Sequence, residues 1–481
     1  MTDGTQRTRS GRPGTRRRRS ERVKTGPSDD VAVAQNVGSA QADLDMPRFE
    51  VRDLPADFNL AEEASSTTRP SRGPTFTPEP VRHDVAFDEE RIDADAARVV
   101  RRLTRSGFQA FLVGGCVRDL LLGCRPKDFD VTTDASPDDV RRLFRNSRII
   151  GRRFRLVHVL FSGGKVIETA TFRRAPPQED DRDGAELLIR SDNEFGESHE
   201  DALRRDFTVN GLFYDLDARQ VLDWVGGMPD IERRTINTIG DPVIRFQEDP
   251  IRILRAIKFA ARLDCGIAPL VYDAIVQCRG SLAMAARPRL FEELLRLLRG
   301  GASHRSVYLA WETGVLDVLL PELASYLSDE PESGGQVWRV LQQVDAMTKE
   351  RGAPVSDLVL CAALLVEPML ETCVNARDRM RTAGEFLEPL IDRLNMPRRI
   401  ADALRRIVAL LPRIEAGRVG RFQRTALFTD AAAVQSIRQA AQAAANAPAP
   451  SANSAADPAA ASRTRRRRRK PGTSVQSETT A

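Results

Sequence analysis

The sequence predicts an α+β protein: a small mixed or antiparallel sheet with helices, followed by an all-α region, with disordered N- and C-terminal tails. Short apolar runs bounded by glycines alternate with amphipathic segments in the first half of the chain. After about residue 248 the apolar residues keep helical spacing. Both ends lack hydrophobic periodicity, which is typical of disorder.

These patterns divide the chain into five parts. We expect a disordered arm over residues 1–85, a sheet domain over 86–230, a helical neck over 231–300, an all-helical body over 301–440 and a disordered basic tail over 441–481.

Charge is concentrated at the ends of the chain. Lys+Arg number 73 and Asp+Glu 68, so the net charge is only 73 − 68 = +5. Dense basic runs nevertheless occupy residues 16–19 and the C-terminal tail, where they comprise Arg465, Arg466, Arg467, Arg468, Arg469 and Lys470. Such runs often bind nucleic acid, although a tail that only aids solubility has the same composition. We favour RNA binding for the C-terminal run.

Cysteine usage and hydropathy restrict the cellular setting. The six cysteines form no Cys-x-x-Cys pair, which argues against a zinc site, and a disulfide framework is not expected in a chain of this size. No run approaches the roughly 20 apolar residues that span a bilayer. The basic N-terminus lacks the apolar core of a secretory signal. We therefore expect a cytoplasmic protein without a membrane span.

The stretch 111–130 carries the strongest chemical signal. It reads as a strand, a turn at Gly114-Gly115, a short helix, a loop and a second strand. The second strand opens with Asp128-Phe129-Asp130 and continues through residues 131–133. Glycines before a helix let backbone N–H groups approach phosphate. Period-two spacing places both carboxylates on one strand face, with Phe129 in the core, and a divalent cation is the usual reason for such a pair. Each piece alone could be an ordinary turn or a solvated strand edge.

The following segment continues the sheet. Ser136-Pro137 starts a helix that reaches about Phe144, and residues 149–161 and 165–172 form strands around a glycine turn. Glu168 either joins the carboxylates or is an exposed strand residue, and the sequence leaves both open. Residues 173–198 are polar and acidic, which predicts a long loop.

A second polar cluster spans residues 201–212. Here Arg205, Asp206 and Asn210 could gather around a triphosphate and ribose, because arginine forks bind phosphate and Asp or Asn can bond hydroxyls. A surface helix with ion pairs is the alternative. Residues 214–224 predict a hairpin, and a Gly-Gly turn at 226–227 follows.

A long helix is predicted from Glu248 to Leu263, with Asp249 as its cap and Pro250 as its first residue. Asp249 and Arg252 share one helix face and could hydrogen-bond to a nucleobase, or could form an ordinary ion pair. Another amphipathic helix covers residues 287–298.

Five of these stretches resemble, in order, the motifs of the nucleotidyltransferase family that contains tRNA CCA-adding enzymes and bacterial poly(A) polymerases. The resemblance covers about residues 85–300 and implies a nucleotidyltransferase palm over 86–230 and a nucleobase-reading neck over 231–300. It also implies template-independent nucleotide transfer to RNA 3′ ends.

The resemblance assigns a role to each candidate residue. Asp128 and Asp130 would hold two Mg²⁺ ions about 3.5–4 Å apart, and Asp206 would complete the catalytic carboxylate set. The nucleotide-binding residues would comprise Gly114, Gly115 and Arg118 as the phosphate cradle, Arg205 and Asn210 near triphosphate and ribose, Asp249 and Arg252 as the base readers, and Arg255 as a further phosphate contact.

Residues 150–159 favour the poly(A) polymerase branch. They contain Arg155-Leu156-Val157-His158, which is similar to the Arg-Leu-x-His of that branch, whereas CCA-adding enzymes typically have a Gly-Thr pair nearby. ATP is then the expected substrate. A CCA-adding enzyme and a noncatalytic RNA-binding relative remain alternatives, while a phosphohydrolase based on the lone dipeptide His83-Asp84 is unsupported. RNA-degradation or RNA-chaperone proteins are plausible partners from the family.

Overall fold

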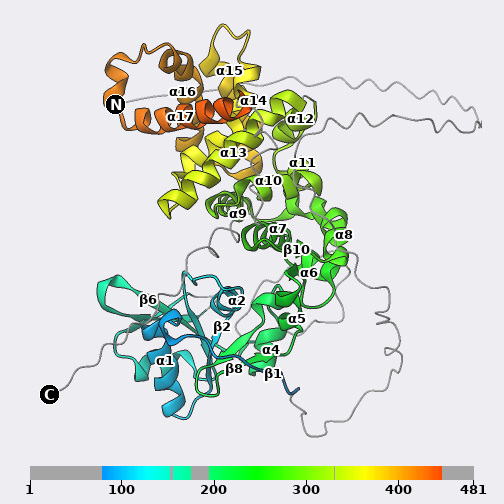
Figure 1. Cartoon of the computed structure of the whole chain (residues 1–481), viewed down its shortest axis with the longest axis vertical. Helices are drawn as coiled ribbons and strands as arrows, with labels where there is room; N and C mark the ends of the chain where they lie inside the picture. The colour runs from blue at the N-terminus through cyan, green and yellow to red at the C-terminus, as the bar shows by residue number, and fades with distance from the viewer. Residues whose placement is uncertain (1–77, 152–154, 175–193, 330, 447–481) are drawn as a thin grey trace, which may run out of the picture. The chain divides into compact units, whose positions relative to one another are not determined.

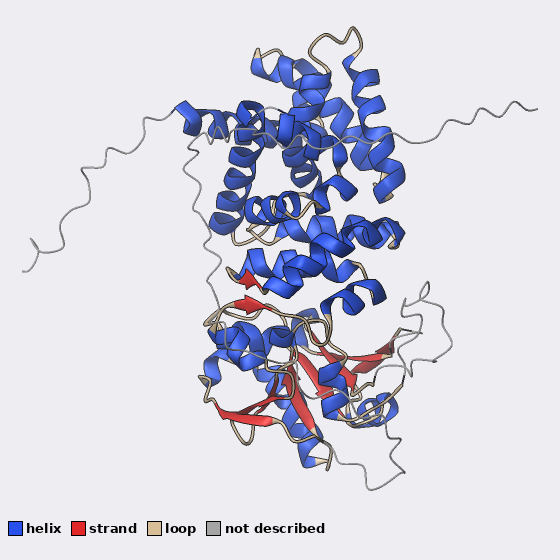
Figure 2. Ribbon diagram, turned by 90° about the vertical axis from the view of Figure 1, so that its right-hand side faces the viewer, coloured by secondary structure: helices blue, strands red, loops and turns tan. Residues whose placement is uncertain are grey.

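The computed structural model describes residues 78–151, 155–174, 194–329 and 331–446. Within these residues a mixed sheet with helices is followed by an all-helical C-terminal region, as the sequence predicts (Figures 1 and 2). The arm before residue 78 and the basic run at Arg465–Lys470 lie outside the described residues, as does most of the acidic loop.

The sheet has eight strands in the order β1-β8-β7-β2-β3-β6-β5-β4. Their bounds are β1 Val81–Asp84, β2 Ala110–Val113, β3 Asp130–Thr133, β4 Ser147–Ile150, β5 Leu156–Leu160, β6 Val166–Thr171, β7 Phe213–Asp215 and β8 Gln220–Asp223. Only β3 and β6 pair in parallel, and the other neighbours in the sheet are antiparallel. Strand β1 lies inside the segment that we expected to be a disordered arm ending at residue 85, because it pairs with β8.

One face of the sheet is covered by helix α1 (Ala94–Arg105), which begins where the Asp93 side chain accepts hydrogen bonds from two backbone N–H groups. Val131 of β3 and Ile167 of β6 are buried in the same apolar core as this helix. Because side chains alternate along a strand, Asp130 and Glu168 point to the opposite face. The position of α1 therefore leaves the carboxylates on the face that α1 does not cover.

Short helices follow the strands at the turns that the sequence indicates. Helix α2 (Gly115–Leu121) follows β2, and α3 (Pro137–Leu143) starts at a capping box between Ser136 and Asp139. Helices α4 (Ser198–Leu203) and α5 (Gly227–Glu232) flank the predicted hairpin, which is formed by β7 and β8. Phe129 is 9% exposed and packs in the core, as its position between the two aspartates predicts.

Between residues 231 and 300, the bounds of the expected neck, the structure has two helices that the sequence analysis does not indicate, α6 (Pro242–Glu248) and α8 (Pro269–Cys278). Strands β9 (Thr235–Ile236) and β10 (Gly266–Ile267) pair in parallel, and α6 precedes α7 (Ile251–Leu263). The predicted helix from Glu248 is therefore two elements. Asp249 is extended and accepts a hydrogen bond from the N–H of Ile251, so the chain bends at Asp249-Pro250 and Glu248 belongs to the earlier helix.

Helices α8 and α9 complete the neck, and helices α10 to α17 build the body. Their bounds are α8 Pro269–Cys278, α9 Arg287–Arg299, α10 Ser303–Glu312, α11 Val315–Leu319, α12 Pro321–Asp329, α13 Pro331–Arg351, α14 Asp357–Thr372, α15 Arg379–Leu394, α16 Arg398–Glu415 and α17 Ala426–Asn446. Helix α17 passes the expected domain boundary at residue 440, because its last turns are rich in alanine, the strongest helix former. No helix in the described ranges combines the length and the apolar character needed to cross a bilayer.

A buried arginine fixes the last helix of the body. Arg438 of α17 is 8% exposed and donates to Glu367 of α14 at 2.6 Å and to Glu415 of α16 at 3.0 Å. Glu367 has a side-chain exposure of 11%, so it depends on this partner, whereas the side chain of Glu415 is 47% exposed and is screened by water.

We expect Arg438→Met to lower the free energy of unfolding by about 3 kcal/mol, because it leaves the Glu367 carboxylate buried and unpaired. The double variant Arg438→Met/Glu367→Met should recover much of that loss, since both buried charges are then gone. Urea unfolding of the three proteins measures this. Equal losses in the single and double variants would show that packing, and not the ion pair, fixes α17.

Candidate active site

Three carboxylates lie together at the start of β3. Asp130 is the Cα partner of Glu168 on the parallel strand β6, and Asp128 lies two residues before it. The pKa of Asp130 is raised to about 6, first because neighbouring protein groups displace part of its hydration, and then because Glu168 and Asp128 add like charge. Arg205 acts in the opposite direction. Two carboxylates and one guanidinium thus act on the charge of Asp130.

A divalent cation suits this arrangement. Within the described ranges no group of three or more His, Cys, Asp or Glu side chains is placed to hold a metal by itself. Mg²⁺ usually takes one or two carboxylates and completes its shell with water and substrate phosphates. The pair Asp128 and Asp130, with Glu168 beside Asp130, fits that donor set.

The row of carboxylates continues across the sheet to His158. On β5, His158 is the Cα partner of Glu168, and its Nε2 lies 3.5 Å from the Glu168 carboxylate. Glu168 therefore has Asp130 on one side and His158 on the other, and its side chain is 53% exposed. The histidine that distinguishes the two branches in sequence lies one strand away from the carboxylates.

The glycine turn approaches an arginine as well as the carboxylates. Gly114 has φ +74°, and a Cβ at this position would come within 3.2 Å of an Arg205 Nη1 atom, so both backbone conformation and space favour glycine. The N–H of Gly114 already donates to the carbonyl of Leu212. Gly114 therefore shapes the turn but does not offer its own N–H to a phosphate, which leaves Gly115 as the glycine of the expected cradle.

Arg205 carries a guanidinium whose charge acts on Asp130. One Nη atom donates to Asp201 at 2.8 Å, and the group lies over the Phe213 ring at 5.3 Å. The Nε atom of Arg205 is buried without a hydrogen-bond partner in the part of the chain that the structure describes. A fixed guanidinium with an unused N–H group can donate to a phosphate oxygen.

Arg118 has a different place from the expected phosphate cradle. It is 3% exposed, donates to Asp119 and to Asn210 Oδ1 at 2.6 Å, and stacks on the Phe259 ring at 5.0 Å. Its donors thus face protein groups. The structure gives Arg118 the role of holding Asn210 and joining α2 to α7.

Asp206 is held by three groups of the protein. One oxygen accepts from the Asn210 amide at 3.1 Å and from the N–H of Phe207, and the other accepts from Arg255 Nε at 2.6 Å. Burial alone would raise the pKa of Asp206, but the Arg255 charge and these hydrogen bonds outweigh it and lower the pKa. With both oxygens engaged by protein groups, Asp206 anchors α7 to the sheet domain. Its place in the catalytic carboxylate set stays a prediction.

Asp249 and Arg252, the expected base readers, each form an ion pair with another residue. Asp249 Oδ2 accepts from Arg289 of α9 at 2.8 Å, and Arg252 donates to Glu248 at 2.7 Å and to the carbonyl of Arg245. The alternative of an Asp249–Arg252 ion pair is therefore not found within the described residues. Both side chains are oriented by neighbours before any nucleotide arrives.

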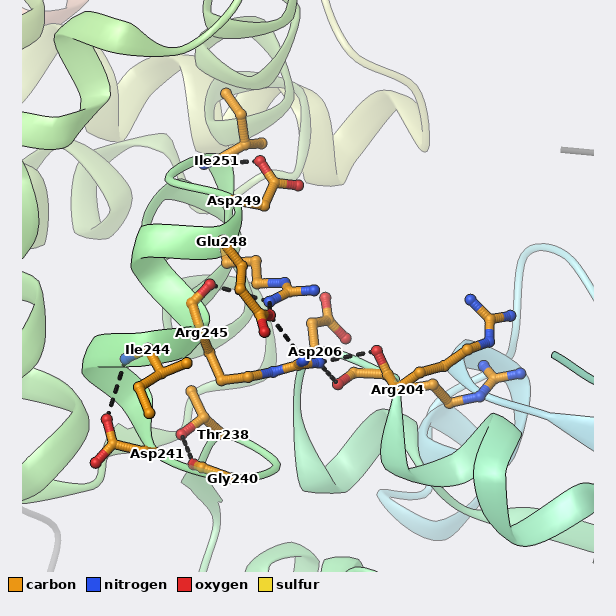
Figure 3. Close-up of polar contacts among 12 residues, drawn as sticks. Arg204, Asp206, Thr238, Gly240, Asp241, Ile244, Arg245, Glu248, Asp249 and Ile251 are labelled. Carbon is orange, nitrogen blue, oxygen red and sulfur yellow. Dashed lines mark hydrogen bonds and ion pairs between the residues drawn. The ribbon is translucent and has the colours of Figure 1, made fainter. Parts of the chain in front are cut away.

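Arg245 joins the neck to the second cluster (Figure 3). Its guanidinium donates to the carbonyls of Arg204 and Arg205, at 2.8 and 2.6 Å, and to Glu248 at 2.8 Å. The sequence analysis missed Arg245, Glu248 and Arg289 as partners. The spacing of Arg245 and Glu248, three residues apart on one helix, was an available signal for the first pair; nothing local indicates that Arg289 meets Asp249.

Comparison with known proteins identifies the family. Residues 110–237 match the Poly A polymerase head domain, and residues 266–327 match the probable RNA and SrmB-binding site of polymerase A. Poly(A) polymerase I of Salmonella typhimurium is 41% identical over 320 residues, which cover 65% of this chain and 68% of that protein. The chain belongs to the poly(A) polymerase I family. It is an RNA nucleotidyltransferase, as the sequence motifs predict.

CCA-adding enzymes are related to this poly(A) polymerase I family member over a shorter stretch. The enzyme of Bacillus pumilus is 37% identical over 224 residues, 47% of this chain and 54% of that protein. The CCA-adding enzyme of Bacillus stearothermophilus in complex with CTP has a similar structure, with a TM-score of 0.52, 28% identity and coverage of 73% of this chain and 78% of the other. A tRNA nucleotidyltransferase with primer tRNA and an incoming ATP analog shares the fold, with a TM-score of 0.51, 21% identity and coverage of 72% and 97%.

Replacing Asp130 by Asn should stabilise the metal-free protein at pH 7.5. Because the pKa of Asp130 is raised in the folded state, ionisation of this carboxyl lowers the free energy of unfolding. The loss begins above pH 3.8, the ordinary pKa, and is complete above about pH 6. After allowance for solvent screening, we expect Tm to rise by about 2 °C. Mg²⁺ should raise the Tm of the unaltered protein and not that of Asp130→Asn. Asp273→Asn, an exposed charge change on α8, is the control, and an equal Mg²⁺ response in all three proteins would contradict the metal assignment.

Replacing Asp206 by Asn should destabilise the protein in a pH-dependent manner. Because the folded-state pKa of Asp206 is lowered, its stabilisation is complete above the ordinary value of 3.8 and is lost as pH falls through the folded-state value. We expect a loss of about 3 kcal/mol at pH 7, since Arg255 is left unpaired. Urea unfolding at pH 7 and pH 3.5 should give a clearly smaller difference at the lower pH. A loss that does not change with pH would exclude the ion pair as its cause.

Proposed function

We propose that this chain is a template-independent poly(A) polymerase that adds AMP from ATP to RNA 3′ ends and releases pyrophosphate. The observation that favours this activity over CCA addition is the extent of similarity: 41% identity over 65% of the chain to a poly(A) polymerase I, against 37% over 47% to a CCA-adding enzyme. His158, at the position that resembles the poly(A) polymerase branch, lies beside Glu168 in the row of carboxylates.

In this proposal the 3′-hydroxyl oxygen of RNA attacks the α-phosphorus of ATP. A new P–O bond forms, the bond between the α- and β-phosphates breaks, and the hydroxyl proton leaves. Asp128 and Asp130 would hold Mg²⁺, which supplies Lewis-acid activation of the hydroxyl and neutralises phosphate charge. Arg205, with its unused buried Nε, binds a phosphate oxygen. Positioning and charge stabilisation then supply most of the catalysis.

Asp249 and Arg252 are proposed to read the adenine. The Watson–Crick edge of adenine offers an amino donor beside a ring-nitrogen acceptor, which suits a carboxylate beside a guanidinium. Asp249 contacts Arg289 when no nucleotide is present, so the adenine amino group would share or replace that contact. Arg252 is held by Glu248, which restricts its motion and fixes the direction of its remaining donors.

The ribose and the triphosphate are proposed to lie against the second cluster. Asn210 is held by Arg118 and Asp206, so its orientation is set by protein contacts before ribose binds. Arg255 forms an ion pair with Asp206, so its main proposed role is to hold Asp206 in place. A contact of Arg255 with phosphate would come second to that ion pair. The basic run at residues 465–470 is proposed to hold RNA through its phosphates, and RNA-degradation or RNA-chaperone proteins remain proposed partners.

Nucleotide incorporation tests this proposal. Purified protein with Mg²⁺ should extend a generic RNA by many residues with ATP alone, and Asp128→Ala should reduce the rate by about three orders of magnitude, because a metal ligand is lost while RNA binding is kept. A short addition that requires CTP and is confined to tRNA lacking its CCA end would identify a CCA-adding enzyme instead. Full activity of Asp128→Ala would remove Asp128 from the metal site.

A further inference from the structure

A depression of about 320 Å³ lies between the C-terminal half of α1 and the end of β5, away from the proposed active site. It is lined by Arg98 and Arg102 of α1, Phe144 and Asn146 after α3, Leu160 at the end of β5, and Phe161 and Ser162 after that strand. Its volume falls within the range of small-molecule sites and is sufficient for one nucleotide. None of these residues belongs to the motifs that the proposed function uses.

The depression lies beside the helix that covers the other face of the sheet. Val131 and Ile167 pack in one core with α1, whereas Asp130 and Glu168 alternate with them and point away from it. From β3 to β5 the sheet spans two strand spacings, about 10 Å. A ligand in the depression therefore cannot be the nucleotide whose phosphate reacts at Asp128 and Asp130.

Two arginine–phenylalanine stacks give the depression its chemistry. The guanidinium carbon of Arg98 lies 5.7 Å from the Phe161 ring centre, and that of Arg102 lies 5.1 Å from the Phe144 ring centre. Stacking holds each guanidinium as a flat cationic surface, which can stack on a nucleobase and donate to a phosphate. Arg98 also contacts Asp95 at 3.0 Å, while Arg102 has no ion-pair partner among the described residues.

The surroundings favour an anionic polymer. The two acids at the start of α1, Asp93 and Asp95, are already paired with Lys165. The C-terminal half of α1 adds Arg101 and Arg105, which are exposed and make no ion pair within the described ranges. Positive charge therefore continues along the helix beyond the depression itself, as it does in grooves that follow a nucleic-acid backbone.

We propose that this depression binds one nucleotide of the RNA substrate upstream of the reacting 3′ end, with the base against the stacked Arg102 and a phosphate near Arg98. The inference rests on the proposed function, since it assumes an RNA substrate. RNA must pass around the sheet to reach from one face to the other. A strand of about ten nucleotides, at 3.4 Å per stacked nucleotide, is long enough, while a trinucleotide is not.

The test compares two substitutions at Arg102 with one at Arg101. Full-length protein is titrated into fluorescently labelled A20 RNA, and Kd is measured by anisotropy at several salt concentrations. We expect Arg102→Ala to weaken binding about tenfold and Arg102→Lys to weaken it nearly as much, because lysine keeps the charge but loses the planar stack. Arg101→Ala, on the same helix but outside the depression, should weaken binding by about twofold, as expected for one lost charge.

Extension of RNA primers of two lengths distinguishes a failure of this inference from a failure of the proposed function. Unaltered protein should extend both A20 and a trinucleotide with ATP, and Arg102→Ala should raise KM for A20 while leaving trinucleotide extension unchanged. If the unaltered protein extends neither RNA, the proposed function fails. If it extends both and Arg102→Ala or Arg102→Lys binds A20 as tightly as the unaltered protein, the depression is not an RNA site. Millimolar AMP that binds only when Arg102 is present, without affecting A20 binding, would assign the depression to free nucleotide and overturn the RNA proposal.

Discussion

The contact between Asp206 and Arg255 joins the two halves of the proposed site. Asp206 follows α4 in the sheet domain, and Arg255 lies one turn into α7, the helix that begins beside the base readers. The same carboxylate accepts from Asn210, which Arg118 orients. An acid that the sequence analysis expects in the catalytic carboxylate set thus also links the phosphate-binding region to the base-reading region. Catalysis by positioning depends on such links.

Within the sheet, the strand register determines which charged side chains lie beside one another. The parallel pairing of β3 with β6 brings Glu168 beside Asp130, and the antiparallel pairing of β6 with β5 brings His158 beside Glu168. A shift of one residue in either pairing would send these side chains to the face that packs on α1. Val131 and Ile167 prevent that shift, because their burial fixes which residues face α1. The apolar core therefore determines the order of charged groups on the other face.

The sequence predicted local secondary structure better than it predicted which side chains contact each other. The glycine turn, the Asp128-Phe129-Asp130 strand start, the hairpin after Asn210 and the helical body each have signals within a few residues, and the structure has each of them. The roles of Arg118 and Asp206 did not follow, because both side chains meet groups many positions away and become buried. The sequence analysis placed the start of α7 at Asp249-Pro250 but missed α6, the helix to which Glu248 belongs. Short-range patterns carry no information about which distant charge neutralises a buried one.

The attachment of α6 to the turn after α4 has a consequence for sequence variation. Arg245 donates to the backbone carbonyls of residues 204 and 205, so this link does not depend on the side chains at those two positions. Substitutions there could change how the protein meets a phosphate without loosening the neck. Variation at 245 would have the reverse effect, because a single side chain supplies all the donors of that link. This contact therefore tolerates substitution at residues 204 and 205 but not at residue 245.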